Sequence, residues 1–151
     1  MQQVAIVVVL GAVAAGIAWF VQRRTSPAPE TGASWNVPPL VDRDDFDRPD
    51  APWLVIVFSS QTCTACQGTA AKAALLESDV VAVQEVDHLE RRDLHQRYGI
   101  DAVPMVLVAD AAGTVRADFI GEPTATDLWA AVAELRDPGS VPPSCTGDIC
   151  G

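Results

Sequence analysis

WLVIVFSSQTCTAC, residues 53–66, is the stretch that decides the fold of this 151-residue chain. Its first half, Trp53–Ser59, is a continuous apolar and β-branched run, which is typical of a strand buried on both faces of a sheet. The Ala-rich segment from Cys63 to Ser78 has helical spacing and predicts a helix. The order is therefore strand, tight turn and helix, with two cysteines where the helix begins.

The rest of the domain continues this alternation of strands and helices. The other predicted elements are an extended piece at Val37–Val41, strands at Val80–Val86, Met105–Ala109 and Val115–Ile120, a helix at Leu89–Tyr98, and a last helix from Thr124 or Thr126 to Arg136. Asp110–Gly113 reads as the loop of a hairpin. The order βαβαββα predicts an α/β sandwich, with one mixed sheet flanked by helices.

The charge of the chain disfavours two kinds of binding. It carries 20 Asp and Glu against ten Lys and Arg, a net charge of −10. Such a surface repels phosphate backbones and anionic headgroups, so nucleic-acid binding and a polybasic membrane patch are both disfavoured. The four cysteines are too few for a disulfide scaffold, so their spacing carries the information.

An uncharged apolar run precedes the domain. Val4–Val21 holds 18 apolar residues, which span roughly 27 Å as a helix and fit one transmembrane segment. A cleaved signal peptide is the alternative, but no Lys or Arg precedes the run. Arg23 and Arg24 follow it, and the positive-inside rule then favours a cytoplasmic domain over an extracytoplasmic one. We expect a bacterial inner or plasma membrane protein.

The regions on either side of the domain have the composition of flexible segments. Residues 22–34 are rich in Pro, Ala, Ser, Thr and Gly and are expected to form a linker. The folded domain is expected over residues 35–136. Residues 137–151 have the same character as the linker and form a tail that carries Cys145 and Cys150.

Cys63 and Cys66 lie where a buried strand gives way to a helix. Backbone N–H groups and the helix dipole stabilise a thiolate at such a position, and a second cysteine three residues on can close a disulfide with it. The pair suits reversible two-electron exchange. Two alternatives are a zinc site shared with Cys145 and Cys150 and a pair of inert core cysteines.

Val103 and Pro104 stand directly before the strand at Met105. Proline lacks the N–H that a ladder would use. A cis bond here would leave the backbone of Val103 free to pair with an extended peptide, whereas a trans proline would simply open the strand.

Further motifs accompany the two cysteines and Pro104. They are Phe58 at the end of the first strand, Tyr98-Gly99-Ile100, Gly113 in the hairpin and Gly121 after the last strand. Over roughly residues 37–136, these motifs together resemble the thioredoxin family. The resemblance implies a thioredoxin fold, with Cys63 as attacking thiolate and Cys66 as resolving thiol. It also implies a cis Pro104, and a substrate groove shaped by Val103 and Gly121.

The sequence departs from the family pattern around the cysteines. Thr62, Thr64 and Ala65 replace the usual Trp, Gly and Pro. Val57 stands where the family commonly has a buried Asp, six residues before Cys63. Glu85 or Asp87 could substitute for it, but both are expected at the surface or at the strand end. His88 and His95 are also expected at the surface.

We therefore expect a membrane-tethered thiol–disulfide oxidoreductase that acts on protein disulfides through the Cys63–Cys66 dithiol. It needs no cofactor besides that redox-active disulfide, and no metal. The expected partners are protein disulfides, the lipid bilayer, and a thiol reductant such as a thioredoxin reductase or a membrane electron donor. Cys145 and Cys150 are expected to be accessory or incidental thiols. The alternatives are a tethered interaction module without turnover and a cysteine-based metal-binding protein.

Overall fold

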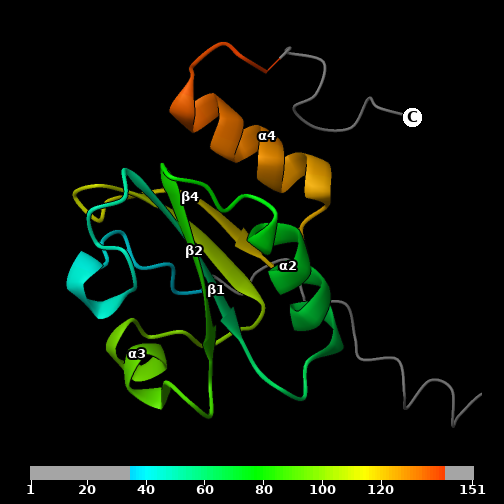
Figure 1. Ribbon diagram of the computed structural model, residues 1–151. Coiled ribbons are helices and arrows are strands. Elements are labelled where there is room, and N and C mark those ends of the chain that lie inside the picture. The colour runs from blue at the N-terminus through cyan, green and yellow to red at the C-terminus, as the bar shows by residue number, and fades with distance from the viewer. Residues whose placement is uncertain (1–34, 142–151) are drawn as a thin grey trace, which may run out of the picture. The chain divides into compact units, whose positions relative to one another are not determined.

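The computed structural model describes residues 35–141, which fold around one four-stranded sheet (Figure 1). The elements are η1 (Arg43–Asp45, a 3₁₀ turn), β1 (Trp53–Ser59), α2 (Thr64–Ala74), β2 (Val81–Asp87), α3 (Arg92–Arg97), β3 (Met105–Asp110), β4 (Val115–Ile120) and α4 (Ala125–Arg136). The strand order is β2-β1-β3-β4, with β1 parallel to β2 and antiparallel to β3. This confirms the predicted mixed sheet between helices.

The central strand β1 is buried along nearly its whole length and separates two apolar cores. Val55 and Val57 face one core, where they pack with side chains of α2 and α4, among them Ala73 and Leu128. The alternate residues of β1 face the other core, which contains Leu94 of α3. In Figure 1, α2 and α4 accordingly lie apart from α3.

Residues 37–41 do not form the strand that the sequence predicts. The structure has only one isolated bridge there, between Leu40 and Thr114, before the chain turns into η1. Pro38 and Pro39 explain the difference, because two consecutive residues without an N–H cannot extend a ladder. η1 itself was not predicted.

The predicted helices are present, but two of them are shorter than expected. α2 ends at Ala74 instead of Ser78, because the N–H groups of Leu76 and Glu77 bond to carbonyls three residues back and tighten the chain into a turn. α3 covers Arg92–Arg97, within the predicted Leu89–Tyr98. α4 begins at Ala125 with Thr124 as its N-cap, one of the two caps predicted.

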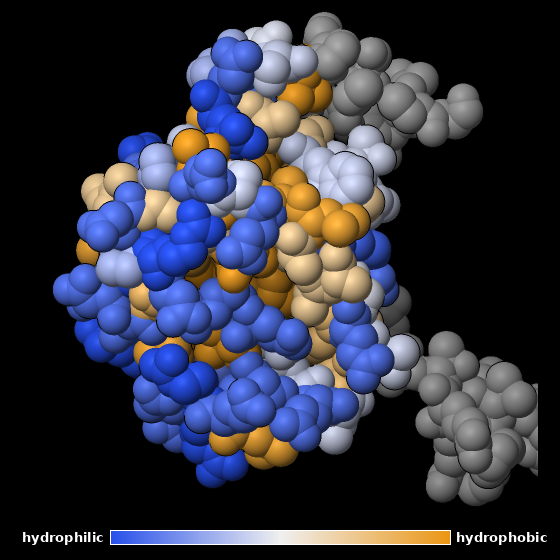
Figure 2. Space-filling model, in the orientation of Figure 1, coloured by the Kyte–Doolittle hydropathy of each residue, from blue (hydrophilic) through white to orange (hydrophobic). Residues whose placement is uncertain are grey.

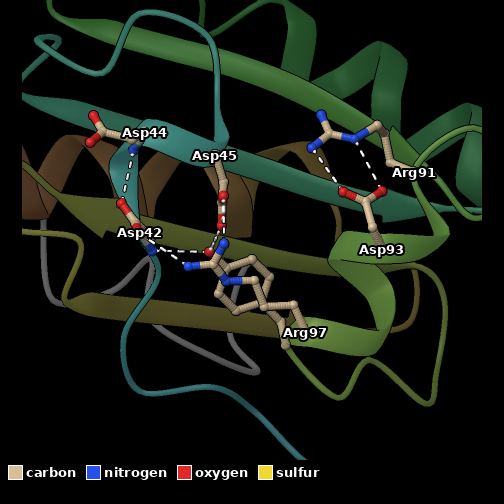
Figure 3. A network of polar contacts seen from close by, with 7 residues as sticks. Asp42, Asp44, Asp45, Arg91, Asp93 and Arg97 are labelled. Atoms are coloured by element: carbon tan, nitrogen blue, oxygen red, sulfur yellow. Dashed lines mark hydrogen bonds and ion pairs between the residues drawn. The ribbon is translucent and has the colours of Figure 1, made fainter.

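A network of polar contacts ties α3 to η1 (Figure 3). Arg97 pairs with Asp45 at 2.8 Å and with Asp42 at 3.2 Å. The Tyr98 hydroxyl donates to Asp45 and accepts from the Asp42 N–H at 3.0 Å. Burial, aided by the Asp45 carboxylate, raises the pKa of Tyr98 to about 12, so the hydroxyl stays protonated and keeps donating at neutral pH.

No helix between residues 35 and 141 is long and apolar enough to cross a bilayer. The predicted transmembrane helix Val4–Val21 and the linker at residues 22–34 lie outside the described residues, as do Cys145 and Cys150 of the predicted tail.

Candidate active site

The two cysteines form a disulfide at the start of α2, with their Cα atoms 5.3 Å apart. Cys63 is the N-cap residue of the helix and is half-buried, whereas Cys66 is only 1 % exposed. The Cys63 N–H donates to the Ser60 carbonyl at 2.9 Å, which holds the loop after β1 in place. An incoming disulfide can therefore reach Cys63, but not Cys66.

The surroundings of Cys63 favour an anion on its sulfur. Its Sγ accepts a hydrogen bond from the Cys66 N–H at 3.2 Å, an N–H group of the first helical turn that also donates to the Cys63 carbonyl at 3.2 Å. The first turn of α2 contains no acidic side chain whose charge would repel a thiolate on Cys63. A thiolate formed on Cys63 is thus stabilised by the backbone.

Val103, Pro104 and Gly121 come together at the same end of the sheet. Phe58 pairs with Met105, so Pro104 lies level with the last residue of β1, just before the cysteine loop. The Val103–Pro104 peptide bond is cis, as the family resemblance implies. The Gly121 N–H donates to the Pro104 carbonyl at 2.9 Å. Within residues 35–141, neither the N–H nor the C=O of Val103 has a hydrogen-bond partner, so both remain available to a peptide.

The loop that carries Gly121 is clamped to α2. Lys72 of α2 forms an ion pair with Glu122 at 2.6 Å, and its ammonium also donates to the Pro123 carbonyl at 3.1 Å. The indole of Trp129 in α4 donates to the Lys72 carbonyl at 3.1 Å. These contacts tie the loop of Gly121 to the helix that carries the cysteines.

No carboxylate lies in the core at the position where the family commonly has an Asp. Val57 is 1 % exposed and packs against apolar side chains. Glu85 is exposed, and Asp87 is the last residue of β2, where it accepts the Leu89 N–H at 2.8 Å. The expectation that both lie at the surface or the strand end is confirmed. Two residues after Val57, the Ser59 hydroxyl is buried without a hydrogen-bond partner among the described residues.

The prediction that His95 lies at the surface is wrong. The side chain is 3 % exposed, its Nε2 lies 2.9 Å from the Val86 carbonyl, and its ring packs edge-on against His88. The sequence contains a signal for this burial, because at helical spacing His95 falls on the same face as Leu94 and the aromatic ring of Tyr98, the C-cap residue of α3. His88 is half-buried.

Within residues 35–141, no three Cys, His, Asp or Glu side chains cluster as metal ligands do. The zinc site considered from the sequence would need Cys145 and Cys150, which lie outside those residues.

Comparison with known proteins agrees with this geometry. The sequence profile of the thioredoxin family matches residues 43–134. Among solved structures, the germline-specific thioredoxin protein Deadhead from Drosophila melanogaster is 21 % identical with a TM-score of 0.51, over 58 % of this chain and 84 % of its own. A malarial protein is 17 % identical with a TM-score of 0.50, over 55 % of this chain and 96 % of its own. At these identities the two structures show a shared fold alone, and no curated protein sequence matches the chain. The family profile matches more than half of this chain, and the chain therefore belongs to the thioredoxin family.

Proposed function

We propose that this protein is a membrane-tethered thiol–disulfide oxidoreductase that reduces or exchanges disulfides in other proteins. A thioredoxin domain with its two cysteines in a disulfide supports thiol–disulfide chemistry at a general level. The observation that carries the proposal is the asymmetry of the pair. Cys63 is reachable and bonded to the helix N-terminus, while Cys66 is buried behind it.

This asymmetry assigns a role to each sulfur. In the reducing direction, the Cys63 thiolate attacks one sulfur of the substrate disulfide and expels the other as a thiolate, which leaves a mixed disulfide on Cys63. Cys66 then loses its proton and attacks the Cys63 sulfur, which releases the substrate's second thiolate. The dithiol becomes the disulfide seen here, and two electrons have moved to the substrate. A thiol reductant must restore the dithiol.

Replacing the resolving cysteine tests this order of events. In a Cys66→Ser variant the second attack cannot occur, so covalent adducts with substrate proteins should accumulate and disappear on treatment with dithiothreitol. They can be counted on non-reducing gels of cell extracts, after rapid acid quenching of the thiols. Cys63→Ser is the matched control, because it removes the attacking sulfur and should give no adducts.

A tethered peptide-binding module without turnover is the second candidate. The buried Val57 favours it, because no carboxylate at that position can take the proton of Cys66. Such a module would give no dithiothreitol-sensitive adducts in either variant. That outcome would contradict the oxidoreductase proposal and support the module.

The tether and the partners belong to the same proposal. The 18 apolar residues of Val4–Val21 support a single membrane-spanning helix, and Arg23 and Arg24 after it support a cytoplasmic domain. A thioredoxin reductase or a membrane electron donor would then return electrons to the Cys63–Cys66 disulfide. Cys145 and Cys150 are proposed as accessory thiols.

A further inference from the structure

A small pocket opens beside the reactive disulfide. One of its walls is Ser60, whose carbonyl holds the Cys63 N–H, and another is Val103, which precedes the cis Pro104. A substrate peptide that pairs with the free backbone of Val103 would run past this opening. Because side chains of an extended peptide alternate between two sides, one residue near the reacting cysteine would point toward the pocket.

The pocket has a size that suits one side chain. Its volume is about 230 Å³. Pockets that hold drug-sized ligands or cofactors measure roughly 300–1,000 Å³. We therefore consider a single residue of the substrate, rather than a free small molecule, as its occupant.

The remaining walls present hydrogen-bond acceptors. His95 lies against the Val86 carbonyl through Nε2. A carbonyl oxygen only accepts, so Nε2 carries the hydrogen, and in the neutral ring Nδ1 is left as an acceptor. Desolvation by burial lowers the pKa of His95, against the opposing effect of the Val86 bond, so the ring is neutral at pH 7. Ser60 and His88 add further polar groups to the walls.

The charge around the pocket is negative. Asp101 is exposed in its wall, and the charge of Asp87 on the neighbouring strand reaches His95. None of the residues that line the pocket is Lys or Arg. Residues 35–141 as a whole contain eight basic and eighteen acidic side chains, which gives a net charge of −10. Hydrophilic residues cover much of the face shown in Figure 2.

We propose that this pocket receives the side chain of a Lys or Arg next to the reacting cysteine of the substrate. The carboxylate of Asp101 and the acceptors of His95 and Ser60 would bind the cation, while the charge of Asp101 would repel an acidic side chain. The inference rests on the proposed function, because it concerns the substrate of the Cys63–Cys66 dithiol. It narrows that substrate to proteins with a basic residue beside a disulfide.

Two symmetric peptide disulfides that differ only in a Lys or a Glu next to the cysteine test the proposal. The full-length protein in detergent is reduced, and its oxidation to the Cys63–Cys66 disulfide by each peptide is followed, as one peptide disulfide becomes two thiols. Each second-order rate constant is divided by that of the same peptide with dithiothreitol, which removes the intrinsic difference between the peptides. We expect the corrected rate constant to be about three to five times higher for the Lys peptide, the size of one partly exposed ion pair.

Two variants separate the pocket from the general charge of the protein. Asp101→Asn should bring the ratio of the two rate constants close to one. Asp79→Asn removes the same charge from an exposed turn before β2, at the opposite end of the sheet, and should keep the ratio. Equal rates in the unmodified protein, a preference for Glu, or an equal loss in both variants would overturn the pocket proposal. If neither peptide oxidises the protein, the proposed function fails instead.

Discussion

His95 is packed edge-on between Phe58 and His88, with ring centroids 5.1 and 4.9 Å from its own. Burial lowers its pKa, and the charge of His88 acts in the same direction, while the Val86 carbonyl and the charge of Asp87 oppose the shift. A histidine with a lowered pKa in the folded protein binds a proton more readily in the unfolded chain. The contribution of this group to stability is therefore present above the unfolded value of about 6.5 and declines as the pH falls below it.

A His95→Gln variant should lack this pH dependence of stability. Gln can still donate a hydrogen bond to the Val86 carbonyl but does not titrate. We expect the free energy of unfolding of the unmodified protein to fall more than that of the variant between about pH 7.5 and 5.5. Urea unfolding of both proteins across this range measures the difference. Parallel curves would contradict the neutral, buried state of His95.

At the scale of the elements, one glycine fixes the β3–β4 hairpin against the segment before η1. Gly113 has φ +79° and donates to the Asp110 carbonyl at 2.9 Å, while its own carbonyl accepts the Val41 N–H at 2.8 Å. A Cβ added here would lie 1.9 Å from the Val41 carbonyl oxygen. Neither the left-handed backbone nor the close approach tolerates a side chain.

Gly113→Ala should therefore destabilise the protein by more than the conformational strain alone. Gly139 is the matched control, because it has φ +86° and a Cβ added there would meet no heavy atom within 4 Å. Strain of a non-glycine residue at positive φ costs about 1–2 kcal/mol, and the clash adds to it only at Gly113. Urea midpoints should fall further for Gly113→Ala than for Gly139→Ala. Equal shifts would mean that the backbone at Val41 gives way freely.

The elements differ in how far their sequence predicts them. β1 and α2 are predictable because a seven-residue apolar run and an Ala-rich helix each carry a strong local signal. η1 is not, because its three residues are all charged and its position depends on distant contacts, such as the bonds from Arg43 to the carbonyls of Ala51 and Asp110. A local pattern cannot report such contacts.

The residues of the candidate site also differ in whether the sequence predicts them. Cys63, Cys66 and Pro104 are visible in the sequence because their chemistry depends on residue type and short spacing. The pocket beside them is not, because two of its lining residues, Ser60 and His95, are 35 positions apart and come to line one pocket only in the folded chain. The burial of the Ser59 hydroxyl likewise cannot be predicted from the sequence, because it depends on how the folded chain packs around the end of β1.

At the scale of the whole molecule, the charge of the acidic domain disfavours contact with a membrane, whereas the apolar composition of the N-terminal run favours it. A net charge of −10 over residues 35–141 repels anionic headgroups, so the domain has no electrostatic attraction to a lipid surface. In the proposed tether, attachment depends on Val4–Val21. Charged residues are costly at the centre of a bilayer, so an Ala12→Arg, Val13→Arg double substitution should shift the protein to the soluble fraction after alkaline extraction. Retention in the membrane pellet would contradict the tether.

The side of the membrane can be read from Cys63, because it is the accessible thiol of the pair. A Cys66→Ser, Cys145→Ser, Cys150→Ser variant leaves it as the single thiol. In intact cells treated with a mild reductant, a membrane-impermeant maleimide should not label this variant, because Arg23 and Arg24 favour a cytoplasmic domain. A permeant maleimide in intact cells, and the impermeant one after lysis, should both label it. Labelling from outside would reverse the orientation and require electrons to be supplied across the membrane, since the cytosolic thiol reductants could not reach the disulfide.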